Sequence, residues 1–134
     1  MDNVQSDLMN LLGSQEFIAE VLSRAEAENL AGAIRKRFGN EKAKSDPIWE
    51  TLKQSKSYQG ETGTNYVKQL LTNISDDLIL LIDDWHGYSA LKIATGIQLL
   101  WLLEQSYNFV WYVTDLKMTF LLCRNDHNFV IVCK

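Results

Sequence analysis

The chain has 134 residues, of which 46% are hydrophobic and 22% charged, and its formal net charge is −4. This balance excludes a disordered chain and predicts one globular domain over residues 1–134, which buries roughly two-thirds of its unfolded surface. The acidic charge disfavours nucleic acid as a partner, because binding it depends on basic side chains that neutralise phosphates. We interpret the one local basic cluster, at residues 35–37, as the last turn of a helix.

The sequence gives no sign of export or of membrane insertion. The first residues lack the positive and apolar regions of a signal peptide, and the uninterrupted apolar runs are far shorter than the ~20 residues that span a bilayer. Cys123 and Cys133 lie in apolar, strand-like runs, where a reduced cysteine behaves as a small hydrophobic residue. A disulfide between them would require antiparallel neighbouring strands. We expect a cytoplasmic protein with no membrane partner, cofactor or metal ion.

The first part of the chain has the apolar spacing of helices. Asp2 is placed to cap a first short helix, and Ser14 to cap a second helix. This second helix would run to Phe38, with Gly39 ending it and a break near Ser23.

Two more helices follow in this half. The pair Asp46–Pro47 predicts a helix start, because Asp is a preferred N-cap and Pro is favoured at the first helical position. Residues 55–63 are polar and contain glycine, which predicts a surface loop. Thr64 would cap the next helix, which ends at Asn73.

The second half predicts a sheet. The run Leu78–Ile82 is apolar at every position, as in a central strand covered on both faces. Residues 90–93 predict a short edge strand, and Thr95 would cap a buried helix to about residue 107. Three apolar runs at the end of the chain predict further strands: 109–113, 118–123 and 129–133.

Short turns at residues 115–117 and 125–128 make these last strands sequentially antiparallel, since a parallel pair needs a longer crossover. The predicted fold class is therefore α+β. A helical N-terminal half packs on a mainly antiparallel sheet of four to five strands, with a further buried helix near 95–107. We expect Trp101 and Leu122 to be core residues.

The best candidate for chemistry is the segment Asp83-Asp84-Trp85-His86 at the end of a buried strand. Together with Tyr88 it places carboxylates and aromatic rings in one loop on a rigid strand, which is typical of recognition loops. We therefore predict that these five residues form part of a partner-binding surface.

An enzyme is the alternative interpretation. A small hydrolase or metal-dependent enzyme would use Asp83, Asp84, His86 and His127, and it requires these four side chains to converge in one pocket. His127 lies among Asn and Asp residues that favour turns, so a role in the turn itself is the simpler interpretation. No nucleophile elbow or phosphate loop is present in the sequence.

Several segments together are similar to a known class of proteins. They are Leu80-Leu-Ile-Asp-Asp-Trp85, Phe109-Val-Trp-Tyr-Val113, Leu121-Leu-Cys-Arg-Asn-Asp-His127 and, upstream, Trp49-Glu-Thr-Leu52. About half of the chain resembles small single-domain bacterial immunity proteins of toxin and immunity systems of the contact-dependent type. The resemblance implies a cytoplasmic inhibitor that binds a cognate toxin domain and occludes its active site. It assigns no partner-contacting residue.

Charge indicates what kind of toxin would fit. From Glu61 onward the chain has eight acidic and five basic residues. Acidic side chains can imitate substrate phosphates in a cationic cleft and speed association, which favours a basic nuclease as the partner. A structural subunit of an oligomer is a third hypothesis, with the apolar helix or an edge strand as its contact.

Overall fold

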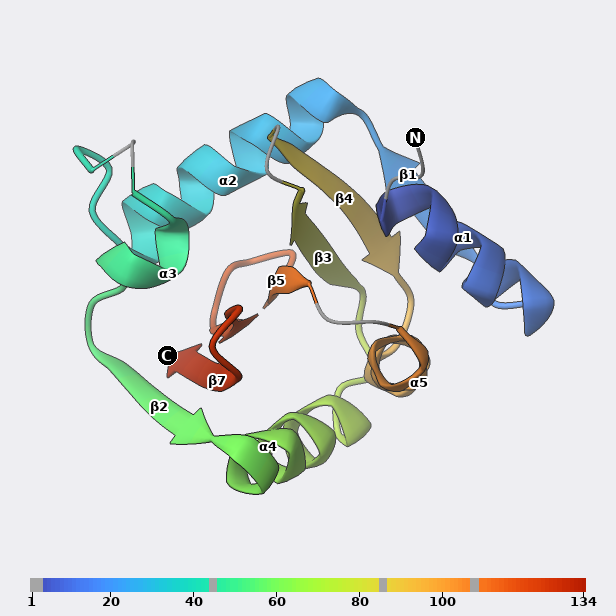
Figure 1. The fold of residues 1–134 in the computed structure, drawn as a ribbon. Coiled ribbons are helices and arrows are strands. Elements are labelled where there is room, and N and C mark those ends of the chain that lie inside the picture. Colours follow the sequence, from blue (N-terminus) through green and yellow to red (C-terminus); the bar gives the residue numbers. More distant parts are fainter. Residues whose placement is uncertain (1–3, 44–45, 85–86, 107–108) are drawn as a thin grey trace.

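The computed structural model describes residues 4–43, 46–84, 87–106 and 109–134 (Figure 1). Within these ranges the chain forms five helices and seven strands. The helices are α1 (Val4–Ser14), α2 (Arg24–Phe38), α3 (Ile48–Thr51), α4 (Gly60–Thr72) and α5 (Gly96–Gln105). The strands are β1 (Ala19–Leu22), β2 (Ser55–Gln59), β3 (Leu78–Asp83), β4 (Tyr88–Ile93), β5 (Val110–Asp115), β6 (Leu121–Arg124) and β7 (Phe129–Cys133).

All seven strands belong to one antiparallel sheet, in the order β1-β4-β3-β5-β6-β7-β2. This confirms the α+β class and the sequential antiparallel pairing of the last three strands. β3 lies between β4 and β5, and every residue from Leu78 to Ile82 is buried, so the prediction of a central strand is also confirmed. β1 and β2 form the two edges.

Each face of the sheet has its own apolar core, because alternate residues of a strand point to opposite faces. Leu80 and Ile82 of β3 pack with residues of α1, α4 and α5, whereas Ile79 and Leu81 pack with residues of α2 and α3. Figure 1 shows α2 and α3 on one side of the sheet and α4 and α5 on the other.

The sheet has two more strands than the largest predicted number. Residues 19–22 were expected in a helix because Phe17, Ile18, Val21 and Leu22 have helical spacing, but they form the edge strand β1. Residues 55–59 were expected in a loop because the segment is polar, but they form β2. An edge strand exposed on one side needs little apolar alternation, so neither segment shows the pattern of a strand.

β1 also corrects the expectation for β4. Residues 90–93 were predicted as an edge strand, but β1 pairs with β4 along Ala19–Leu22 and makes it internal.

One predicted helix start, at Thr95, and the predicted break near Ser23 are confirmed. The Ser23 side chain accepts from the Glu26 amide, and the Glu26 side chain accepts from the Ser23 amide, so the break near Ser23 is the N-cap of α2. The Thr95 hydroxyl accepts from the Gln98 amide at the start of α5.

The other helix starts differ from the predictions. α3 has Pro47 as its N-cap, not Asp46, and it is only four residues long. α4 begins at Gly60, which has a φ of +60°, and not after Thr64. Asp2 lies outside the described residues.

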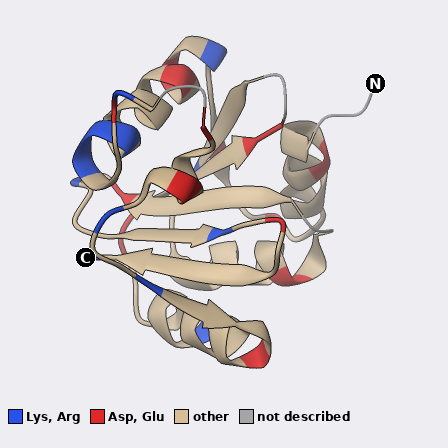
Figure 2. Ribbon diagram, turned by 60° about the vertical axis from the view of Figure 1, so that its left-hand side comes forward, with Lys and Arg blue, Asp and Glu red and all other residues tan. Residues whose placement is uncertain are grey.

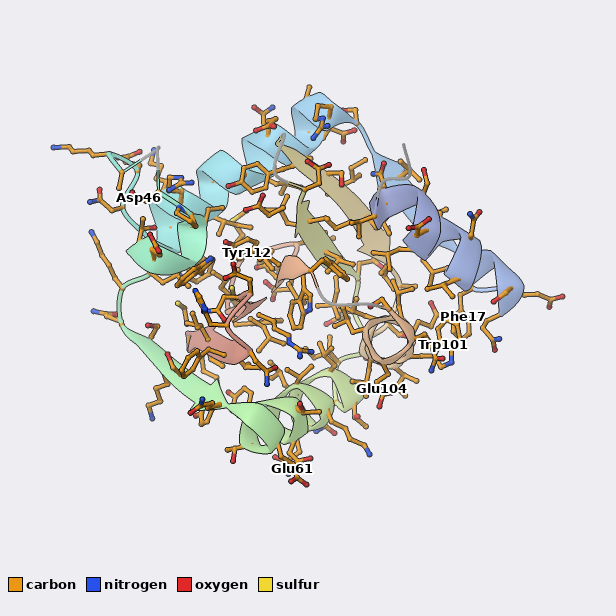
Figure 3. The ribbon with its side chains drawn as sticks, viewed as in Figure 1. Phe17, Asp46, Glu61, Trp101, Glu104 and Tyr112 are labelled. Atoms are coloured by element: carbon orange, nitrogen blue, oxygen red, sulfur yellow. The ribbon has the colours of Figure 1, made fainter. Side chains whose placement is uncertain are left out.

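Of the two predicted core residues, Leu122 is fully buried. Trp101 is only partly buried, and its ring meets the edge of Phe17 with the ring centroids 5.5 Å apart. The prediction that Trp101 is a core residue was therefore wrong in the degree of burial, because the Trp101 ring packs against the core from outside. Figure 3 shows both rings between α1 and α5.

Both cysteines are buried free thiols on the neighbouring strands β6 and β7. Cys123 lies opposite Ile131, and Cys133 lies opposite Leu121, so the two are diagonal neighbours. Diagonal Cα atoms are about 7–8 Å apart, beyond the range that a disulfide bridges without moving the backbone. None of the described helices is both long and apolar enough to cross a membrane.

Candidate functional site

The candidate site is the turn between β3 and β4, at the end of the central strand. Asp83 is the last residue of β3 and lies opposite Tyr88, the first residue of β4. The Asp84 amide donates to the Gly87 carbonyl over 3.1 Å, which closes the turn. Trp85 and His86, the two residues between them, lie outside the described residues.

The first two turns of α2 hold this turn from the side. The Arg24 guanidinium donates to the Tyr88 carbonyl over 2.8 Å, and the Tyr88 amide donates to a Glu28 carboxylate oxygen over 3.1 Å. Arg24 also lies 3.6 Å from the carboxylate of Asp84. Both backbone groups of Tyr88 are therefore fixed by side chains of one helix, about 60 residues earlier in the chain.

Gly87 makes this close approach of α2 feasible. Its φ is +138°, a conformation that residues with a side chain rarely adopt. A Cβ at this position would lie 2.6 Å from the Glu28 carboxylate and 3.0 Å from the Arg24 guanidinium. The contacts between turn and helix thus require glycine here.

Asp83 belongs to the face of the sheet that α2 covers, as Ile79 and Leu81 do. Burial raises the pKa of the Tyr88 hydroxyl, and the negative charge of Asp83 raises it further. Arg35 opposes this effect through its positive charge and a side-chain hydrogen bond to Tyr88. The site therefore contains three carboxylates (Asp83, Asp84 and Glu28), two guanidinium groups (Arg24 and Arg35) and one phenol, and the opposite charges partly compensate one another.

Arg35 is itself buried and connects the site to the loop after α2. Its guanidinium donates to the carbonyls of Ala43 and Asp46 over 2.9 and 3.1 Å. The basic cluster at residues 35–37 is therefore the last turn of a helix, as predicted. Figure 2 shows this turn in blue at the C-terminal end of α2.

His127 lies at the same end of the sheet as Asp83 but on the far side of β5, in the turn between β6 and β7. Its amide donates to the side chain of the buried Asn125, as expected for a turn-forming segment. The imidazole is largely exposed, meets the Trp49 ring edge-on and lies 3.6 Å from Asp126.

The structure thus brings Asp83, Asp84 and Tyr88 together, whereas His127 has other neighbours. No group of three or more metal-binding side chains occurs in the described ranges. The enzyme alternative additionally needs His86, which lies outside these ranges, so it stays a prediction. In the described part of the site, the charged groups fix the backbone of Tyr88 and hold Asp84 beside Arg24.

A second surface feature lies at the opposite end of β4. A pocket of about 350 Å³ opens between the loop that precedes β3 and the start of α5. Its lining is mainly apolar, with Phe17 and Ile97 as the large side chains, and 61% of the Ile97 surface is exposed.

Sequence patterns identified the turn but not the residues that hold it. In the sequence, Arg24 and Glu28 resemble any charged residues on the exposed side of a helix. Nothing in the sequence indicates that their side chains contact a turn some 60 residues away. The pocket was missed for the same reason, because its walls come from three separate segments. Gly87 was the one usable signal, since a glycine beside a charged turn marks a close backbone approach.

Comparisons with protein-family models, with curated proteins and with solved structures gave no match for this chain.

Proposed function

We propose that the protein is an immunity protein: a cytoplasmic inhibitor that binds a cognate bacterial toxin domain, a basic nuclease, and occludes its active site. The observation that carries the proposal is the bracing of the β3–β4 turn by α2. Arg24 and Glu28 bond both backbone groups of Tyr88, and Arg24 also pairs with Asp84. Residues of a binding surface whose backbone is held before binding, as that of Tyr88 is, lose little conformational entropy on binding.

The position of the turn supports the same function. It extends from β3, the central strand, whose apolar residues are buried on both faces. A rigid sheet that carries a polar and aromatic loop is the usual arrangement of a recognition surface. The proposed contact residues are those predicted from the sequence: Asp83, Asp84, Trp85, His86 and Tyr88.

The acidic character of the chain supports a basic partner. The net charge is −4, and carboxylates can occupy the place of phosphates in a nuclease cleft. Asp84 is already paired with Arg24, so its charge is partly compensated, and exposed carboxylates elsewhere would add to the attraction at long range.

The test is protection followed by binding. Toxin domains encoded beside this gene are expressed with and without the protein, and purified pairs are measured for complex formation. We expect growth to be restored and a complex that buries on the order of 1,600 Å² in total. If none of the neighbouring toxin domains is neutralised or bound, the proposal is wrong.

Kinetics then locate the interface. Asp83→Asn should mainly slow association and weaken its salt dependence, whereas Trp85→Ala should speed dissociation if the ring is an anchor. Glu104→Gln is the matched control, because Glu104 is an exposed carboxylate on α5 (Figure 3). Folded variants at all five proposed contact residues that leave both rates unchanged would place the interface elsewhere.

A further inference from the structure

The hydrogen-bond pattern of β4 determines which backbone groups of the edge strand β1 point away from the sheet. Asp84 and Gly87 form a hydrogen-bonded pair, and such pairs alternate along antiparallel strands. The odd-numbered residues of β4 therefore bond to β3, and its even-numbered residues, Ala90 and Lys92, direct their backbone groups toward β1. The amide and carbonyl of Tyr88 follow the same alternation and bond to side chains of α2 on that side.

This alternation fixes the orientation of β1. Leu22 and Glu20 lie opposite Ala90 and Lys92 and bond inward. Ala19 and Val21 consequently direct their amide and carbonyl groups to the open edge, where β1 has no neighbouring strand in the described part of the chain. Such groups are a template for the addition of another strand.

The side chains around this edge are apolar and acidic. Ile18 is 83% exposed and Val21 is 51% exposed, which is unusual for β-branched residues in a folded domain. Glu16 and Glu20 are exposed beside them. An extended segment that pairs with β1 would therefore meet apolar contacts and negative charge together.

The edge connects both surface features described above. At its C-terminal end, β1 leads through Ser23 into the first turn of α2, which holds the β3–β4 turn. At its N-terminal end, Ala19 lies opposite Ile93, and Phe17, two residues earlier, lines the pocket with Ile97. The turn, the edge and the pocket form one continuous border of the molecule.

We propose that β1 is a docking strand: the protein partner adds an extended, basic segment along β1 and inserts an apolar side chain into the pocket at Phe17 and Ile97. The inference rests on the proposed function, because it extends the binding surface from the β3–β4 turn. Charge selects this occupant over a second copy of the chain, since an antiparallel self-pair centred on Glu20 would bring the two Glu20 carboxylates together.

The probe is a short fluorescein-labelled peptide of alternating lysine and valine with one leucine at its end, titrated by fluorescence anisotropy against the full chain. We expect a dissociation constant tighter than about 1 mM, with no binding of the peptide in which glutamate replaces lysine. Val21→Pro removes one outward amide, and proline is tolerated at such positions of edge strands, so this variant should bind about threefold to tenfold more weakly. Val21→Thr, which keeps the amide, is its control.

Two further pairs of variants test charge and pocket. Glu20→Lys should weaken binding by about twofold to fivefold, whereas Glu61→Lys on α4 makes the same change of net charge and should not. Ile97→Asn should weaken binding, whereas Leu116→Asn, at an exposed apolar residue beyond β5, should not.

A wild-type protein that fails to bind the lysine peptide overturns the inference, as does equal binding by folded Val21→Pro and Val21→Thr. Circular dichroism and thermal unfolding establish that each variant is folded. The proposed function is judged separately: a toxin domain bound with unchanged affinity by Val21→Pro and Ile97→Asn would retain the immunity function and refute the docking strand.

Discussion

Tyr112 is a fully buried side chain of β5, and its hydroxyl is the only polar group of that side chain. The hydroxyl accepts a hydrogen bond of 3.1 Å from the Trp49 amide at the start of α3. Burial raises the pKa of this hydroxyl far above its ordinary value of 10.0, so it is neutral at pH 7. One atom thereby attaches the short helix α3 to the centre of the sheet (Figure 3).

We predict that Tyr112→Phe lowers the free energy of unfolding by about 1–3 kcal/mol, because it leaves the Trp49 amide without its acceptor. The measurement is urea unfolding followed by circular dichroism. Tyr58→Phe is the control, since Tyr58 is only half-buried and its ring stacks on Tyr66. Equal effects of the two substitutions would mean that the hydroxyl of Tyr112 contributes nothing specific.

The capping box at the start of α2 predicts a dependence on pH. The hydrogen bond from the Ser23 amide lowers the pKa of Glu26 from its ordinary value of 4.5. A lowered pKa in the folded state stabilises the protein above the ordinary value, and this contribution is lost as the pH falls through the lowered pKa. We predict that Glu26→Gln lowers the melting temperature at pH 7, and that the difference from wild type shrinks well below pH 4.5. A constant difference across this range would contradict the prediction.

At the scale of elements, the contact between α4 and α5 depends on a glycine. The Gly96 amide donates to the Ile74 carbonyl over 2.8 Å, and a Cβ on Gly96 would overlap the carbonyl of Leu71. We predict that Gly96→Ala destabilises the protein by about 1–3 kcal/mol, because backbone cannot move aside as a flexible side chain can.

Gly32 provides the matched control. It lies within α2, where a Cβ would have no atom within 4 Å, so Gly32→Ala should stabilise the protein by about 0.5–1 kcal/mol through helix propensity. Both variants are measured by thermal and urea unfolding. A Gly96→Ala variant that is as stable as the wild type, or more stable, would show that α4 and α5 are not in the described contact.

The elements that could be predicted from the sequence are those with a strong apolar period. The run at 78–82 and the three terminal strands were recognisable, and so was the cap Thr95, because each has a local physical signature. Near Ser23 the sequence indicated a break in a helix but not the cap of a new one. β1 and β2 had none. Their membership in the sheet is decided by neighbours at residues 90–93 and 129–133, which a local pattern does not reveal.

The candidate site shows the same limit. Asp83, Asp84 and Tyr88 were identified because they follow a buried strand. Their bracing by Arg24 and Glu28 depends on how α2 packs on β4, and a tertiary contact of this kind leaves no spacing in the sequence.

At the scale of the whole molecule, one sheet separates two apolar cores that do not touch each other directly. The helices on the two sides are joined through the same central strands, since alternate residues of β3 and β5 serve opposite cores. Loss of either core would expose one face of those strands. The two cores should therefore unfold together, which is the behaviour expected if residues 1–134 are a single domain.

Trp49 and Trp101 report on the two cores separately. Trp49 packs at the edge of the core beneath α2 and α3, and Trp101 packs at the edge of the core beneath α1 and α5. With 5-fluorotryptophan incorporated, fluorine NMR follows each ring through a urea titration, after single Trp→Phe variants have assigned the four signals. We predict the same midpoint for both signals. Leu102→Ala, which creates a cavity on the α5 side at a cost of about 2–5 kcal/mol, should lower both midpoints equally. If only the Trp101 signal shifts, the two sides of the sheet are independent units.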